Sequence, residues 1–167
     1  ALRYALTYGP RQSPTNPYTG ICSTFAARAR HWMRPLVYED GRQRRAFTYV
    51  GDVAAANLYA AGSDDLDGIA VNVGHQESHA VADFADAVCR AVGRPDVRHD
   101  LDGCYRLLDA RDMVPDTGLL SALGWTASTP LAAGLALFAG WALAADLPVP
   151  PDATAELRSA GILRGGA

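Results

Sequence analysis

Lysine is absent from this sequence, since all 15 of its basic residues are arginines. Any site that needs a lysine amine is therefore excluded from the chain. This removes the phosphate-binding lysine of a P-loop, a Schiff-base lysine, and the lysine that assists the catalytic tyrosine of a dehydrogenase.

Cysteine is scarce as well: Cys22, Cys89 and Cys104 make an odd count, and no Cys-x-x-Cys pair occurs. We expect reduced, mostly buried thiols in a cytoplasmic protein. The four histidines show no spacing typical of metal ligands, so we predict no metal site.

Excess positive charge and long apolar runs are missing too. A formal net charge of -3 argues against a nucleic-acid or anionic-membrane partner. The longest apolar run, residues 131–145, is shorter than the about 18 residues needed to cross a bilayer. We therefore expect a buried helix there and no membrane partner.

What is present indicates an α/β fold of one main unit, residues 1–147, followed by a loosely held tail, residues 148–167. Strands are expected at 2–8 and 68–74, and a hairpin over 36–50 that turns at Asp40-Gly41. Helices are expected at 20–33, 53–61, 79–92, 116–125 and 130–146. Two buried strands cannot close a sheet core, so further strands are expected in a preceding segment or in a partner.

One stretch raises a question of function. "DGRQRRAFTYVGDV", residues 40–53, places Arg42, Arg44 and Arg45 beside a segment that is expected to be buried. An anionic ligand would explain the charge, and so would a solvated turn between two strands.

Four segments, in order and spacing, resemble the extended short-chain dehydrogenase/reductases, and most closely the NAD-dependent sugar-nucleotide epimerases and dehydratases. They are "LRYALTYGPRQSPTNPYTG", "DGRQRRAFTYVGDVAAAN", "AVNVGHQES" and "LGWTASTPLAAGL". The "NPYTGI" segment is most similar to the UDP-glucose 4-epimerase branch. The resemblance covers about residues 2–140 and implies the C-terminal part of a Rossmann-type NAD(P)-binding fold plus the smaller substrate-binding lobe.

The resemblance also shows what this chain lacks. The family's glycine-rich dinucleotide loop and its Tyr-x-x-x-Lys pair precede the matching region, so no catalytic residue is predicted here. NAD would be bound mainly by that other half of the enzyme, and this half would bind a UDP- or dTDP-linked sugar. The implied contacts to NAD in this chain are Tyr4 and Leu6, at a strand end that approaches the nicotinamide.

For the substrate, the resemblance implies that Arg45 contacts the diphosphate, and the planar guanidinium suits phosphate oxygens. Strand alternation would then turn Arg44 away, and Arg42 would be solvated. Val37 and Tyr38 match positions along the base, where the tyrosine ring could stack or could instead pack in the hairpin. Further implied contacts lie at the start of the first helix: Tyr18, Gly20 and Ile21.

The sequence departs from the family pattern at three places. The family asparagine of R-Y-F-N is Leu6, and the aspartate after the hairpin arginine is Ala46. The later R-x-G-D arginine, which also grips the diphosphate, has Arg106 and Arg111 as two possible counterparts.

Two hypotheses follow. The first is the substrate-binding half of an NAD-dependent nucleotide-sugar epimerase, which oxidises and re-reduces sugar C4, with a 4,6-dehydratase or a decarboxylase as close alternatives. The second is a non-catalytic binding or interaction module that keeps the fold but not the active site. A homodimer is possible in either case.

Overall fold

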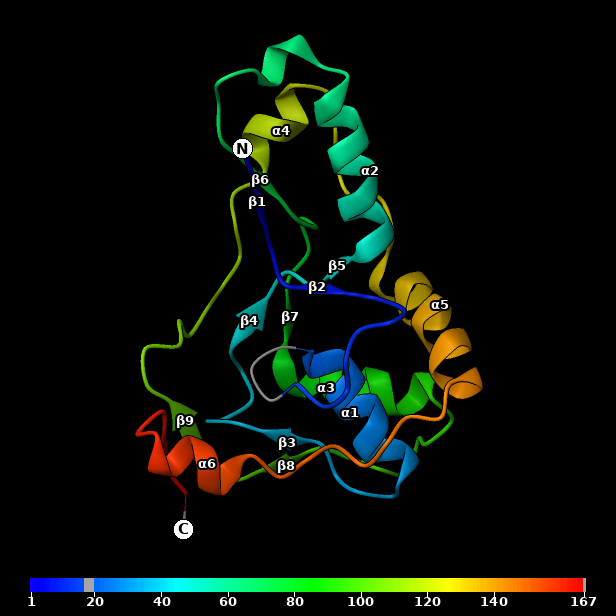
Figure 1. Cartoon of the computed structure of the whole chain (residues 1–167), viewed down its shortest axis with the longest axis vertical. Helices are drawn as coiled ribbons and strands as arrows, with labels where there is room; N and C mark the ends of the chain where they lie inside the picture. The colour runs from blue at the N-terminus through cyan, green and yellow to red at the C-terminus, as the bar shows by residue number, and fades with distance from the viewer. Residues whose placement is uncertain (17–19, 167) are drawn as a thin grey trace.

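The computed structural model describes residues 1–16 and 20–166, and Figure 1 shows a molecule drawn out along one axis. Its helices are α1 (Ile21–Arg30), α2 (Val50–Ala61), α3 (Val81–Ala91), α4 (Gly118–Ala122), α5 (Leu131–Ala144) and α6 (Thr154–Ser159), with a 3-10 turn η1 (Asp64–Leu66). Its strands are β1 (Leu2–Tyr4), β2 (Thr7–Tyr8), β3 (Leu36–Val37), β4 (Arg44–Arg45), β5 (Thr48–Tyr49), β6 (Val71–Val73), β7 (His79–Ala80), β8 (Asp100–Leu101), β9 (Cys104–Arg106) and β10 (Leu163–Gly165).

The strands are short and mostly parallel, which confirms the predicted α/β class. β1 pairs with β6, β2 with β5, and β3 with β8, all in parallel. The predicted strands at 2–8 and 68–74 therefore lie in a common sheet, although the first is split by a bend into β1 and β2. Val71 and Val73 of β6 are buried, as expected for a strand inside a parallel sheet.

The predicted hairpin at Asp40-Gly41 is wrong. The chain does turn there, with Gly41 at a φ of +72° and its N–H bonded to the carbonyl of Tyr38. The two flanking strands do not pair with each other, however, because β3 pairs with β8 and β4 pairs antiparallel with β7. A local Asp-Gly signal thus fixed the turn but not the strand partners, which are chosen by long-range contacts.

The main core lies where α1, α3 and α5 pack together with β2 and β5, in the lower part of Figure 1. Small buried alanines on α1 let α3 approach closely. At the centre the rings of Phe47 and Phe84 stack with centroids 3.6 Å apart, and the ring of Tyr8 meets Phe84 edge-on. Burial on this scale contributes roughly 1.5–3 kcal/mol for each large apolar side chain.

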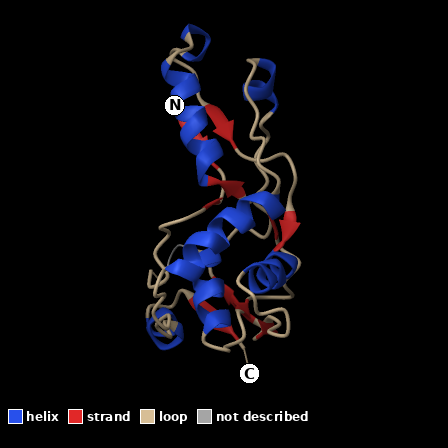
Figure 2. Ribbon diagram, turned by 90° about the vertical axis from the view of Figure 1, so that its right-hand side faces the viewer, coloured by secondary structure: helices blue, strands red, loops and turns tan. Residues whose placement is uncertain are grey.

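A second, smaller core lies in the upper part of Figure 1, between α2, α4 and the β1–β6 pair. Its buried members are Val53, Ala56, Leu66, Val71, Val73 and Leu120. The view in Figure 2 shows the same elongated outline, so the two cores follow one another along the long axis rather than stacking in one layer.

Asp52 connects the two parts. Its carboxylate lies in the first turn of α2. Its oxygens also accept hydrogen bonds from the N–H and the hydroxyl of Thr129, at 3.1 and 3.0 Å. The side chain of Thr129 is thus bonded to Asp52 and does not cap α5.

The apolar run at 131–145 is a helix, but it is buried on one side only. Leu135, Phe138 and Ala142 of α5 are in the main core, whereas Leu137 and Leu143 are more than half exposed. Within the described part of the chain, no helix is both long enough and apolar enough to cross a membrane.

The C-terminal segment has more regular structure than its sequence pattern indicates. Residues 154–159 form α6, and β10 pairs antiparallel with β9. Leu157 and Leu163 are each 2% exposed and form a third small core with Cys104. In Figure 1 this segment closes the lower end of the molecule.

Candidate functional site

Tyr38 and Arg106 come together from distant parts of the chain. Tyr38 directly follows β3, and Arg106 ends β9. The guanidinium carbon of Arg106 lies 5.5 Å from the centroid of the Tyr38 ring. This distance is within the range of a cation–π interaction, which holds a positive charge beside an aromatic surface.

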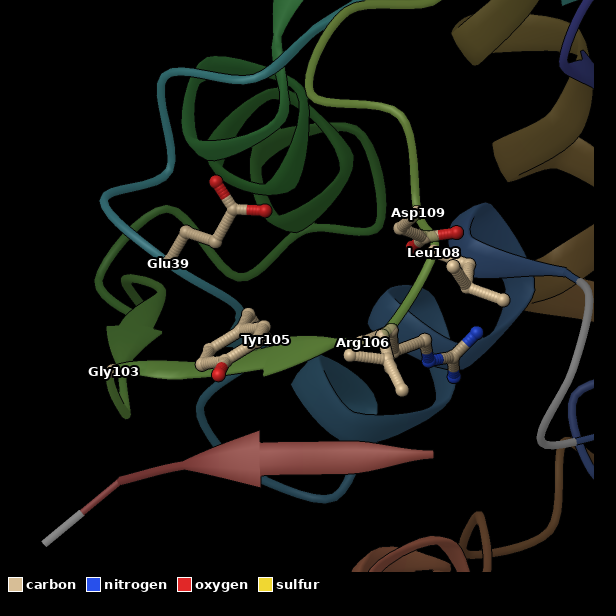
Figure 3. Close-up of a pocket in the computed structure, with 7 residues that line it drawn as sticks. Glu39, Gly103, Tyr105, Arg106, Leu108 and Asp109 are labelled. Atoms are coloured by element: carbon tan, nitrogen blue, oxygen red, sulfur yellow. The ribbon is translucent and has the colours of Figure 1, made fainter. Parts of the chain in front are cut away.

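An open hollow of about 510 Å³ lies beside Arg106. Figure 3 shows Glu39 and Tyr105 on one side of it and Arg106, Leu108 and Asp109 on the other. The guanidinium of Arg106 and the ring of Tyr105 suit an anionic ligand with a planar group, whereas the carboxylates of Glu39 and Asp109 repel an anion. The negative charge of Glu39 is balanced, because Glu39 is ion-paired to Arg111.

Arg45 is buried, with 9% of its surface exposed, so it does not extend into water. Its guanidinium donates to the main-chain carbonyls of Arg44 at 2.9 Å, Arg111 at 2.5 Å and Ala110 at 2.8 Å. These contacts fasten residues 107–113, which we call the linker, across β4. Three of the five N–H donors of Arg45 are therefore directed to the protein's own backbone.

Arg44 and Arg42 both lie at the surface, as strand alternation and the turn predict, although the strand is interrupted between β4 and β5. Arg44 is exposed, and its guanidinium donates to the hydroxyl and carbonyl oxygens of Ser78. The hydroxyl of Ser78 is used in this contact and does not cap α3. Arg42 is exposed at the turn.

Arg111 is bound at the surface by two carboxylates. Its guanidinium lies 2.7 Å from Glu39 and 2.8 Å from Asp40. The hydrogen bond from Arg111 lowers the pKa of Asp40, and the same pair raises the pKa of Arg111. Of the two counterparts considered for the R-x-G-D arginine, Arg111 is therefore already neutralised, while Arg106 lies at the hollow.

The residues from Arg106 to Asp109 read Arg-Leu-Leu-Asp. Leu108 has a φ of 69°, in the left-handed region that favours glycine, and its side chain is 98% exposed. Leu108 thus occupies a position that suits the glycine of Arg-x-Gly-Asp. The sequence alone left this match open because the glycine that marks the motif is missing.

The other predicted substrate contacts that the structure describes are buried or half-buried in the fold. Val37 is fully buried in the main core, which leaves it no surface for a ligand. Gly20 is buried at the start of α1 with a φ of 86°, where a side chain would meet the carbonyl of Ser13. Ile21 is half-buried and packs against the main core. Tyr18 lies outside the described residues.

The predicted contacts to NAD lie near the bend between β1 and β2, away from the hollow along the long axis of the molecule (Figure 1). Tyr4 is 51% exposed, and its hydroxyl donates to the side-chain oxygen of Asn57 at 2.9 Å. Leu6 is half-buried against the main core, and its carbonyl accepts a hydrogen bond from the N–H of Thr48.

A second hollow, of about 570 Å³, lies at the other end of the molecule between α2 and η1. Its lining includes Asp64 and Asp65 but no arginine. Two carboxylates without a partner cation disfavour an anionic ligand, so this hollow is the weaker candidate despite its volume.

No group of three or more His, Cys, Asp or Glu side chains in the described ranges could hold a metal ion. The imidazole of His99 instead pairs with Asp86, with Nδ1 and Oδ1 2.9 Å apart. Burial alone would raise the pKa of Asp86, but the hydrogen bonds from the side chain and backbone of His99 lower it overall.

Comparison with known proteins identifies the family to which the chain is related. The family model for the NAD dependent epimerase/dehydratase family matches residues 1–74. The dTDP-L-rhamnose 4-epimerase of Burkholderia thailandensis is 30% identical over 141 residues, which are 84% of this chain and 38% of that protein. The chain belongs to the NAD-dependent epimerase/dehydratase family.

Solved structures of the family agree with the fold. The UDP-glucose 4-epimerase of Thermotoga maritima, solved with UDP-glucose, is 29% identical with a TM-score of 0.76; the match covers 84% of this chain and 44% of that one. The UDP-glucose 4-epimerase of Thermus thermophilus, solved with NAD, is 30% identical with a TM-score of 0.71, and the match covers 84% and 45%. This chain therefore spans less than half the length of these epimerases and corresponds to their C-terminal part.

Proposed function

We propose that this protein supplies the substrate-binding part of an NAD-dependent nucleotide-sugar 4-epimerase. The observation that carries the proposal is the position of Arg106, which lines the open hollow and lies over the ring of Tyr38. The left-handed backbone two residues later, at Leu108, suits the glycine of R-x-G-D and supports Arg106 as the arginine of that pattern. The epimerase names of its relatives support epimerisation over the dehydratase and decarboxylase alternatives.

In this proposal Arg106 binds the diphosphate and Tyr38 lies beside the base. A guanidinium keeps its charge at all physiological pH values and offers two parallel donors to phosphate oxygens. The ring of Tyr38 lies against this guanidinium, with 5.5 Å between the ring centroid and the guanidinium carbon, and so helps to hold the charge in place. Arg45, which the family resemblance made the first candidate for the diphosphate, holds the linker that follows Arg106, and so supports the site from behind.

The residues of this chain do not fit NAD by themselves. No glycine-rich phosphate loop occurs in the sequence, and the absence of lysine rules out a Tyr-x-x-x-Lys pair. NAD binding and the redox steps at sugar C4 are thus assigned to other parts of the enzyme. The short β1–β6 sheet fits this division, because a parallel sheet of this size needs further strands to cover it.

A homodimer and a cytoplasmic location stay predictions from the sequence. A non-catalytic module that binds the same ligand would differ from the proposed epimerase part only in whether catalytic parts accompany this chain. Both proposals require that the chain binds a UDP- or dTDP-linked nucleotide, so this binding is tested first.

The test is a calorimetric titration of the protein with UDP and with dTDP, using the variant Arg106→Gln and the matched control Arg42→Gln. Both variants remove one positive charge, but only Arg106 lies at the hollow. One lost charge-assisted bond of about 1.5–3 kcal/mol predicts an affinity loss of about 10- to 150-fold for Arg106→Gln. Equal affinities for both variants would remove Arg106 from the site.

A further inference from the structure

The segment 152–166, which we call the C-terminal clasp, attaches to the strand that carries Arg106. β10 pairs antiparallel with β9, and Leu163 lies opposite Arg106 in the register. Beyond the strand pair, the N–H of Leu107 donates to the carbonyl of Ile162 at 2.7 Å. Figure 3 shows β10 running alongside the strand that bears Tyr105 and Arg106.

Side chains of the clasp also support Tyr38. Leu157 and Leu163 form the third small core with Cys104 of β9, and Tyr38 and Ile162 pack against it as partly buried members. One face of the Tyr38 environment is therefore supplied by the clasp, while Arg106 lies over the ring. The two side chains of the proposed ligand site depend on the same small cluster.

β9 is held along both of its edges. On one edge β10 of the clasp is paired with it. On the other edge the carbonyl of Cys104 accepts a hydrogen bond from the N–H of Glu39 at 2.7 Å. Without the clasp, β9 would lose the strand pairing along one edge, and its last residue, Arg106, would continue directly into the exposed linker. The clasp therefore contributes to the order of Arg106.

We propose that the C-terminal clasp is a positioning element of the nucleotide-sugar site, which fixes Arg106 at the rim of the hollow, and the Tyr38 ring against which it lies, before the ligand binds. This inference rests on the proposed function. A guanidinium that is already in place loses less conformational entropy on binding, so the clasp raises affinity without touching the ligand.

The experiment uses the whole chain and three variants: Leu163→Ala, the control Leu143→Ala, and Leu163→Ala combined with Arg106→Gln. Leu163 is 2% exposed in the third small core, whereas Leu143 is 53% exposed on α5. UDP affinity is measured by titration calorimetry. We expect Leu163→Ala to weaken UDP binding about 10-fold, and Leu143→Ala to leave it unchanged.

The combined variant tests the route of the effect. If the clasp acts through Arg106, removal of the guanidinium in the Leu163→Ala background causes much less than its usual loss of affinity, so the two effects are not additive. Purely additive losses would overturn the positioning role. Should Leu163→Ala lose the circular-dichroism spectrum of the fold, Leu163→Val makes a smaller cavity and enters the same cycle.

The outcomes separate the two proposals. If the unmodified protein binds neither UDP nor dTDP, the proposed function fails and this inference fails with it. If the protein binds UDP and Arg106→Gln weakens binding while Leu163→Ala does not, the proposed function stands and the positioning role is refuted.

Discussion

Replacing Arg45 by methionine tests whether this buried guanidinium stabilises the fold or serves only to bind a ligand. Arg45 donates to the carbonyls of Arg44, Ala110 and Arg111. Bonds from a charged donor contribute about 1.5–3 kcal/mol each when no substitute is present. Ala110 and Arg111 are exposed, so their carbonyls can bond to water once the guanidinium is gone. We therefore expect Arg45→Met to lower the free energy of unfolding by about 2–4 kcal/mol, well below the sum of the three.

The assay is urea unfolding followed by circular dichroism, without any nucleotide present. Arg42→Met is the control, because Arg42 is exposed on the same stretch, and a change within about 0.5 kcal/mol is expected for it. Hydrogen exchange should also become faster in the linker, residues 107–113. If the two variants were equally stable, the three carbonyl contacts would contribute nothing and a ligand would remain the only reason for burying Arg45.

Three further predictions concern single positions. Gly134→Ala is expected to lower the free energy of unfolding by about 1–3 kcal/mol, since the new methyl group would overlap the hydroxyl of Tyr8. Gly140→Ala in the same helix meets no neighbouring atom and should raise the free energy of unfolding by about 0.5–1 kcal/mol. Thermal melts compare the two variants. Leu108→Gly should raise the free energy of unfolding in urea by about 0.5 kcal/mol, because it relieves a left-handed backbone at an exposed side chain, and a loss would contradict that reasoning. Asp86 has a lowered pKa, so its contribution is present above the pKa of the unfolded chain and is lost as the pH falls through the folded value. Melting temperatures below about pH 4 should therefore depend less on pH in Asp86→Asn than in the unmodified protein.

Features set by local sequence were predicted well. The helices α1, α2, α3 and α5 follow from apolar spacing and from the prolines and glycines at their ends, and each lies within a few residues of its expected range. Strands were also expected at 2–8 and 68–74, and both occur; β1 and β6 pair in parallel there, and the apolar run of β6 suits a strand covered on both faces.

Features set by distant contacts were not predictable in the same way. The Asp40-Gly41 turn exists, but β3 and β4 pair with β8 and β7, which no local signal specifies. The C-terminal clasp has few apolar residues, and its order depends on the edge of β9, which is more than 50 residues away in the chain.

The candidate site shows both situations. Tyr38 was named from a family pattern, and the structure places it beside a guanidinium. The partner was not singled out, because Leu108 replaces the glycine that would have marked Arg106 as the motif arginine. The left-handed backbone at Leu108, which the sequence does not show, supports Arg106 as the counterpart.

Chemical-shift mapping of the ¹⁵N-labelled protein with UDP tests the central claim most directly, because it reports where the nucleotide binds. The account predicts that the amides of residues 38–39 and 103–109, together with the side-chain Nε–H of Arg106, shift in a saturable manner around the hollow of Figure 3. Saturable shifts confined to the acidic hollow at residues 58–65, with none near Arg106, would contradict it.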